Sequence, residues 1–148
     1  SIAGEGASMF LIEKENKENS IEILDVDVLT TKLTSDINQR LDELLRENSI
    51  DESDLDSLIL GVNGDNRLNK YYDLVKEKYL NTNQYCFKNL CGEYPTAMAF
   101  GLWYANKCLK NNSFHKETSL SDKKRKPKNV LIYNTYLGDQ HGFILLRV

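Results

Sequence analysis

Short apolar segments alternate with amphipathic helical segments through the middle of this sequence. Leu55–Gly61 and Gln84–Phe87 each have the length and composition of a buried strand. Ile37, Leu41, Leu44 and Leu45 lie at helical spacing and predict a helix capped by Thr34 or Ser35. Further helices are expected over Leu68–Leu80 and from Pro95 to about Lys110. Strands that alternate with helices favour a mostly parallel α/β sheet covered by helices.

The two ends of the sequence carry additional strand patterns. Ala7–Glu13 and Ile21–Thr30 are strand-like and flank the polar segment Glu15–Ser20, so we expect an antiparallel hairpin. Val130–Asn134 and Gly142–Leu146 predict two closing strands. The intervening polar segment 111–128, with the basic run Lys123–Lys126, is expected to be a surface loop.

Composition excludes several classes of function. A chain of 148 residues is one domain or part of one, and its net charge of -3 gives no case for a nucleic-acid partner. No apolar run reaches about 18 residues, so no membrane span is predicted. The three cysteines, Cys86, Cys91 and Cys108, have no framework spacing and indicate free thiols in a reducing, cytoplasmic compartment. The sequence contains no recognisable cofactor-binding or metal-binding motif.

Three polar residues are the candidate site: Asn63, Lys88 and Glu93. Each follows a predicted strand or precedes a predicted helix, where ligands bind in open α/β sheets. Each also has an ordinary structural interpretation. Asn63 before Gly64 is a common turn pair, Lys88 suits a solvated loop, and Glu93 suits the dipole of the following helix.

Four segments resemble the β-ketoacyl-acyl-carrier-protein synthases of the thiolase-like superfamily. Residues 4–13 are similar to the family's Gly-Glu-Gly-Ala strand, and residues 55–65 to the strand that enters its His-Gly-Thr-Gly-Thr motif. Residues 88–93, Lys-Asn-Leu-Cys-Gly-Glu, are similar to Lys-Ser-Asn-Ile-Gly-His before a small-residue helix. Residues 130–146 are similar to the closing strands around Asn-Ser-Phe-Gly-Phe-Gly-Gly-Thr-Asn.

The resemblance implies the C-terminal portion of such a protein. Residues 1–32 would supply the final β-hairpin of a missing N-terminal thiolase-like half. Residues 33–148 would form the C-terminal half, a mixed five-stranded sheet covered by helices. The start at Ser1, without an initiator Met, agrees with the expectation of a missing N-terminal partner.

The departures from the family matter for activity. Asn63 and Glu93 stand where the resemblance places two histidines that donate hydrogen bonds during decarboxylative condensation, whereas the lysine is kept as Lys88. An ionised carboxylate has no proton to donate and repels a developing enolate. The family's glycine-rich gating loop is altered to Tyr136–Gln140.

Two functions therefore remain open from the resemblance, in fatty-acid, polyketide or polyene biosynthesis. One is a diverged or catalytically silent subunit like a chain-length factor. The other is an active condensing acyltransferase that uses Asn63 and Lys88 with a cysteine of the missing half. Both imply an acyl carrier protein as partner and a homodimer or a heterodimer with a synthase. A stand-alone binding module that shares the fold by coincidence is a third interpretation.

Overall fold

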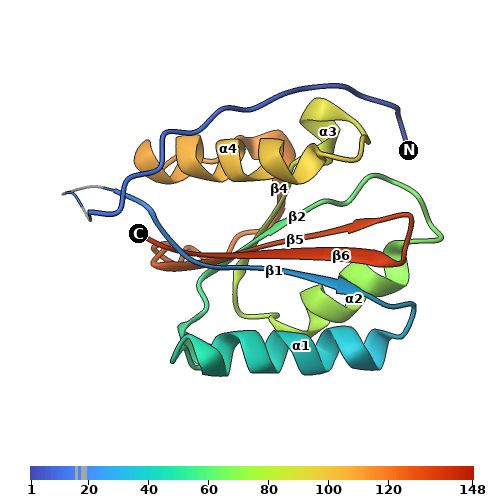
Figure 1. The fold of residues 1–148 in the computed structure, drawn as a ribbon, viewed down its shortest axis with the longest axis horizontal. Helices are drawn as coiled ribbons and strands as arrows, with labels where there is room; N and C mark the ends of the chain where they lie inside the picture. The colour runs from blue at the N-terminus through green and yellow to red at the C-terminus, as the bar shows by residue number, and fades with distance from the viewer. Residues whose placement is uncertain (16, 18–19) are drawn as a thin grey trace.

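The computed structural model describes residues 1–15, 17 and 20–148, which build one mixed sheet with helices on both faces (Figure 1). Across the sheet the strand order is β1-β6-β5-β2-β3-β4. Strand β2 is parallel to β3 and β5, whereas β6 is antiparallel to β5 and β1. The elements in chain order are β1 (Glu22–Thr30), α1 (Thr34–Glu47), β2 (Ser57–Leu60), α2 (Asn69–Lys78), β3 (Asn83–Cys86), α3 (Lys88–Cys91), α4 (Ala97–Lys110), β4 (Ser119–Ser121), β5 (Asn129–Tyr136) and β6 (Gln140–Arg147).

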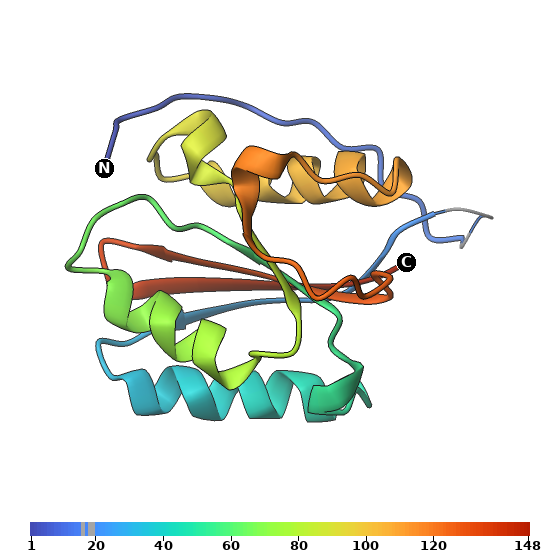
Figure 2. The same cartoon turned by 180° about the vertical axis from the view of Figure 1, so that it is seen from behind.

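Helices cover the sheet in two layers. Helices α1 and α2 lie on one face, and α3 and α4 lie on the other (Figures 1 and 2). The first core contains Ile37, Leu41 and Tyr72 against Leu58, and the second contains Phe87 and residues of α4 against the opposite face. Because both faces are covered, all four residues of β2 are buried, as is typical of a central parallel strand. Within the described residues, no helix has the length and apolarity needed to cross a membrane.

The predicted α/β class is confirmed, with two local differences. The sheet has six strands among the described residues, not five, because β1, which the prediction assigned to a separate hairpin, joins the sheet beside β6. Helix α1 begins at Thr34 with Leu33 as its N-cap, so the predicted cap by Thr34 or Ser35 is wrong. The hydroxyl of Thr31 instead accepts a hydrogen bond from the Leu33 amide at 3.1 Å.

The predicted N-terminal hairpin is wrong. Residues 7–13 form no strand and run along the outside of α4, with Met9, Leu11 and Ile12 largely exposed (Figure 1). Strand β1 pairs instead with β6, from Glu22 opposite Arg147 to Thr30 opposite Gln140. The predicted polar turn over 15–20 includes residues 16, 18 and 19, which lie outside the described residues. The division of the chain into halves at residues 32 and 33 stays a prediction.

The basic segment after α4 is anchored to the sheet. Asn83 on β3 donates to the Arg125 carbonyl at 2.7 Å and accepts from the Lys123 and Arg125 amides at 3.0 and 3.3 Å. Asp56 accepts from the Arg125 guanidinium, with an Nη2 to Oδ1 distance of 2.7 Å. The expected surface loop therefore carries β4 and follows a path that two buried polar side chains fix.

Candidate active site

The ends of two neighbouring parallel strands bring Asn63 and Lys88 together. Strand β2 ends at Leu60 and leads through Gly61 and Val62 to Asn63, whereas β3 ends at Cys86 and leads to Lys88 at the start of α3. Because β2 and β3 are parallel, these residues emerge at the same edge of the sheet. Glu93 lies between α3 and α4 and completes the group. The structure thus brings all three predicted site residues into contact, but Lys88 belongs to a short helix and not to a loop.

The Glu93 carboxylate is the centre of this cluster. Lys88 Nζ donates to Glu93 Oε1 at 2.9 Å and to Oε2 at 2.7 Å. Asn63 Nδ2 donates to the same Oε2 atom. The sequence suggested that Glu93 interacts with the helix that follows it. In the described part of the chain, the hydrogen-bond partners of its carboxylate are the Lys88 and Asn63 side chains.

The Lys88 ammonium is unusual for a lysine because it is buried. Its side chain has no exposed surface, whereas the Glu93 side chain is 18% exposed. Desolvation lowers the pKa of the Lys88 amine, and the hydrogen bond and charge of Glu93 oppose that shift. The solvated-loop interpretation of Lys88 is therefore wrong. A buried amine beside one carboxylate can serve as an ion pair or, when neutral, as a nucleophile.

A second polar layer behind Lys88 comes from residues whose role the sequence did not reveal. Tyr72 on α2 donates to the Gly61 carbonyl at 2.6 Å and accepts from the Thr135 amide at 3.2 Å. Lys88 Nζ also lies 3.5 Å from the Thr135 carbonyl. Burial raises the pKa of the Tyr72 hydroxyl, which remains protonated at neutral pH. The sequence placed Tyr72 only within the helix expected over Leu68–Leu80, because helical spacing does not show which groups its hydroxyl contacts.

Cys91 lies beside this cluster as a thiol. Burial raises the pKa of the Cys91 thiol, while the Lys88 charge opposes that effect. The ring nitrogens of His141 contact Tyr133 and Thr31 instead, at 2.9 and 3.1 Å. His141 is therefore not paired with Cys91 as a base for nucleophilic catalysis, and Cys91 is a small, partly buried thiol.

The N-terminal segment closes over the loop that carries Glu93. The Gly4 amide donates to the Glu93 carbonyl at 3.0 Å, and the Glu93 amide donates to the Ile2 carbonyl at 2.8 Å. A Cβ atom at Gly4 would lie 1.9 Å from the Cys91 carbonyl oxygen, and Gly92 has a φ of 75°. Glycine is therefore required at both positions for this close approach. Ile2 and Gly4 thus hold the backbone of Glu93.

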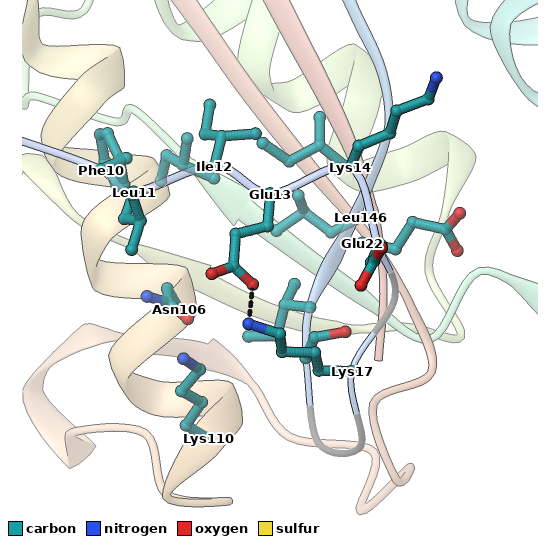
Figure 3. Close-up of a pocket in the computed structure, with 15 residues that line it drawn as sticks. Phe10, Leu11, Ile12, Glu13, Lys14, Lys17, Glu22, Asn106, Lys110 and Leu146 are labelled. Atoms are coloured by element: carbon teal, nitrogen blue, oxygen red, sulfur yellow. Dashed lines mark ion pairs between the residues drawn. The ribbon is translucent and has the colours of Figure 1, made fainter.

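A separate cavity of about 650 Å³ lies beside α4 and away from this cluster. Figure 3 shows Leu11 and Ile12 of the N-terminal segment near α4, with Asn106 and Lys110 on that helix. The Lys17 ammonium forms an ion pair with Glu13 at its rim (Figure 3). The residues that line it include none of Asn63, Lys88 and Glu93. The candidate site is consequently defined by its polar contacts and not by this cavity.

Comparison with known proteins supports the fold. The sequence matches no protein-family model and no curated protein. The structure is similar to the crystal structure of 3-oxoacyl-acyl-carrier-protein synthase III from Aquifex aeolicus, with a TM-score of 0.52 and 13% sequence identity. The match covers 90% of this chain and 46% of that chain, so this chain spans about half the length of the synthase. The chain therefore has a thiolase-like α/β fold.

Proposed function

We propose that this chain is the C-terminal part of a β-ketoacyl synthase-like protein of fatty-acid, polyketide or polyene biosynthesis, and that it is catalytically silent in condensation, like a chain-length factor. The observation that carries the proposal is the hydrogen bonding of Glu93. Its carboxylate accepts from both Lys88 and Asn63. The fold shared with a 3-oxoacyl-acyl-carrier-protein synthase supports the general kind of protein.

The chemistry of decarboxylative condensation explains why this arrangement favours silence. Loss of carbon dioxide from a malonyl thioester leaves an enolate, whose negative oxygen needs preorganised hydrogen-bond donors. Here the two donors of the cluster, the Lys88 ammonium and the Asn63 amide, already point to a carboxylate. Glu93 would also repel the enolate through its own charge. Among the described residues, the Lys88 and Asn63 side chains are therefore already hydrogen-bonded to a carboxylate where negative charge would develop.

The partners of the proposed function follow from the same family. A silent subunit acts beside an active synthase, so we expect a homodimer or a heterodimer with a synthase, together with an acyl carrier protein and an N-terminal half. A cytoplasmic location belongs to this proposal and agrees with the free state of Cys86, Cys91 and Cys108.

A second function is favoured by one observation. Asn63 and Lys88 meet at the carboxyl ends of parallel strands, where an active condensing acyltransferase would need them. In that case Glu93 would have a new role, and the nucleophilic cysteine would come from the N-terminal half.

Condensation by the full-length protein and its Glu93→His variant separates the two functions. The assay supplies an acyl thioester and malonyl-acyl carrier protein, and product is measured by mass spectrometry. The silent function predicts no product from either protein, because Asn63 and the loop 136–140 also differ from the family. Product from the variant would identify an enzyme whose site needs a single donor.

A further inference from the structure

Lys88, Asn63 and Glu93 have the functional groups needed for a reaction within the chain itself. A buried amine and a carboxamide lie on either side of one carboxylate. Lys88 Nζ and Asn63 Nδ2 both donate to Glu93 Oε2, so the two nitrogens lie within hydrogen-bonding distance of a single oxygen atom. We propose that Lys88 and Asn63 form an intramolecular isopeptide bond, with Glu93 transferring the protons.

The first requirement is a nucleophilic amine. The Lys88 side chain is fully buried, and desolvation lowers the pKa of its amine. Glu93 Oε1 and Oε2 are positioned to take the proton that the ammonium must lose. A desolvated lysine that transfers its proton to an adjacent base becomes a neutral nucleophile.

The second requirement is an activated carbonyl. The Asn63 Oδ1 atom accepts a hydrogen bond from the Asp65 backbone amide at 2.9 Å. This donor polarises the carboxamide and stabilises negative charge on Oδ1 when the carbonyl carbon is attacked. The same contact fixes the orientation of the Asn63 side chain, while Glu93 is held at its backbone by Ile2 and Gly4. These contacts fix the Asn63 carboxamide and the Glu93 backbone before any reaction.

The reaction balances without any further reagent. The Lys88 ammonium transfers one proton to Glu93, and the free electron pair of Nζ then bonds to the Asn63 carbonyl carbon. The carbonyl π electrons move to Oδ1. Glu93 returns its proton to Nδ2 and takes a second proton from Nζ. The bond between that carbon and Nδ2 breaks, the carbonyl re-forms, and the ammonia that leaves takes up the second proton as ammonium, which restores the Glu93 carboxylate.

The product fits the position of the cluster in the fold. The new amide would join the loop after β2 to the start of α3, across two neighbouring strands. Glu93 is partly exposed, so ammonium can leave to solvent. The bond would consume both Lys88 and Asn63 and remove one positive charge. This inference goes beyond the proposed function, since a chain without the bond can still be silent in condensation.

The experiment measures the mass of the purified full-length protein and maps its tryptic peptides. The expected mass is lower than that of the sequence by one ammonia. Trypsin cannot cleave after an acylated lysine, so the expected linked species joins peptide 47–67 to peptide 79–107. Glu93→Gln and Lys88→Met should both lack this species, whereas Lys70→Met, which removes an exposed lysine, should retain it.

One side reaction has the same mass change and needs its own control. Asn63 precedes Gly64, and a succinimide at this pair also loses ammonia. A succinimide persists in Lys88→Met and yields no linked peptide. An unlinked chain of full mass, a succinimide alone, or a Lys88–Glu93 link that loses water would each overturn the proposal. A linked Asn63–Lys88 species that depends on Glu93 would establish it, whatever the condensation assay shows.

Discussion

The Lys88 ammonium lies 2.9 and 2.7 Å from the two carboxylate oxygens of Glu93 and has no contact with solvent. Two opposite charges that share a buried site depend on each other, because removal of one leaves the other without compensation. The stability of this end of the sheet therefore depends on the Lys88–Glu93 ion pair. Under the proposed function, neither residue takes part in catalysis.

Loss of one charge should destabilise the protein more than loss of both. We expect Glu93→Gln to lower the free energy of unfolding by about 3 kcal/mol, because the buried ammonium loses its counter-ion. Lys88→Met combined with Glu93→Gln should recover part of that loss. The cycle is measured by urea denaturation in an Asn63→Ala background, which cannot form the isopeptide bond. Strict additivity of the two substitutions would contradict the coupling.

Acidification should weaken the fold through His141. Burial lowers the pKa of the His141 imidazole below its ordinary value of 6.5. Below that pH the unfolded chain binds a proton more readily than the folded chain, so the free energy of unfolding falls as pH falls. The loss ends once the pH lies below the folded-state pKa. Denaturation across this range should show a flatter profile for His141→Phe, and an unchanged slope would refute the assignment to His141.

Replacement of Asp56 should reduce folding stability more than replacement of its partner Arg125. The Asp56 carboxylate accepts from the Arg125 side chain and from the Lys128 and Asn129 amides, both at 3.1 Å. Asp56→Ala leaves two backbone donors unpaired and should cost about 3 kcal/mol. Arg125 is partly exposed, so Arg125→Ala should cost about 1 kcal/mol. Thermal denaturation of the two variants checks this order, and equal losses would argue against a role for the backbone contacts.

A methyl group at Gly61 should disturb the polar layer behind Lys88. A Cβ atom there would lie 2.1 Å from Asn134 Oδ1 and 3.1 Å from the Tyr72 hydroxyl. We expect Gly61→Ala to cost about 2 kcal/mol, because the Asn134 side chain must move within a packed region. Gly142→Ala is the matched control, since its Cβ would meet Met98 at 3.6 Å, an ordinary contact. A smaller loss in Gly61→Ala than in the control would show that Asn134 moves freely.

Much of the fold could be predicted because its patterns are local. Helical spacing of apolar residues located α1, α2 and α4, and continuous apolar runs located β2 and β5. The partner of a strand is not a local property. The strand-like pattern of residues 7–13 predicted an extended chain, but it could not show whether this segment joins a sheet. Strand β1 pairs with β6, which lies more than a hundred residues later in the sequence.

The candidate site was predictable in position but not in chemistry. The rule that parallel strands end at one edge placed Asn63 and Lys88 together. The mutual pairing of Lys88 with Glu93, and the contact between Tyr72 and Thr135, depend on side-chain directions across three elements. No spacing along the sequence encodes those directions.

Release of carbon dioxide from malonyl-acyl carrier protein by the full-length protein tests the central claim most directly. The claim is that Lys88 and Asn63 are not free to donate to the enolate formed by decarboxylation, whether they are hydrogen-bonded to Glu93 or joined to each other. The account predicts release no faster than that of a heat-denatured sample. Sustained turnover above that background, retained when the protein is purified to homogeneity, would contradict it.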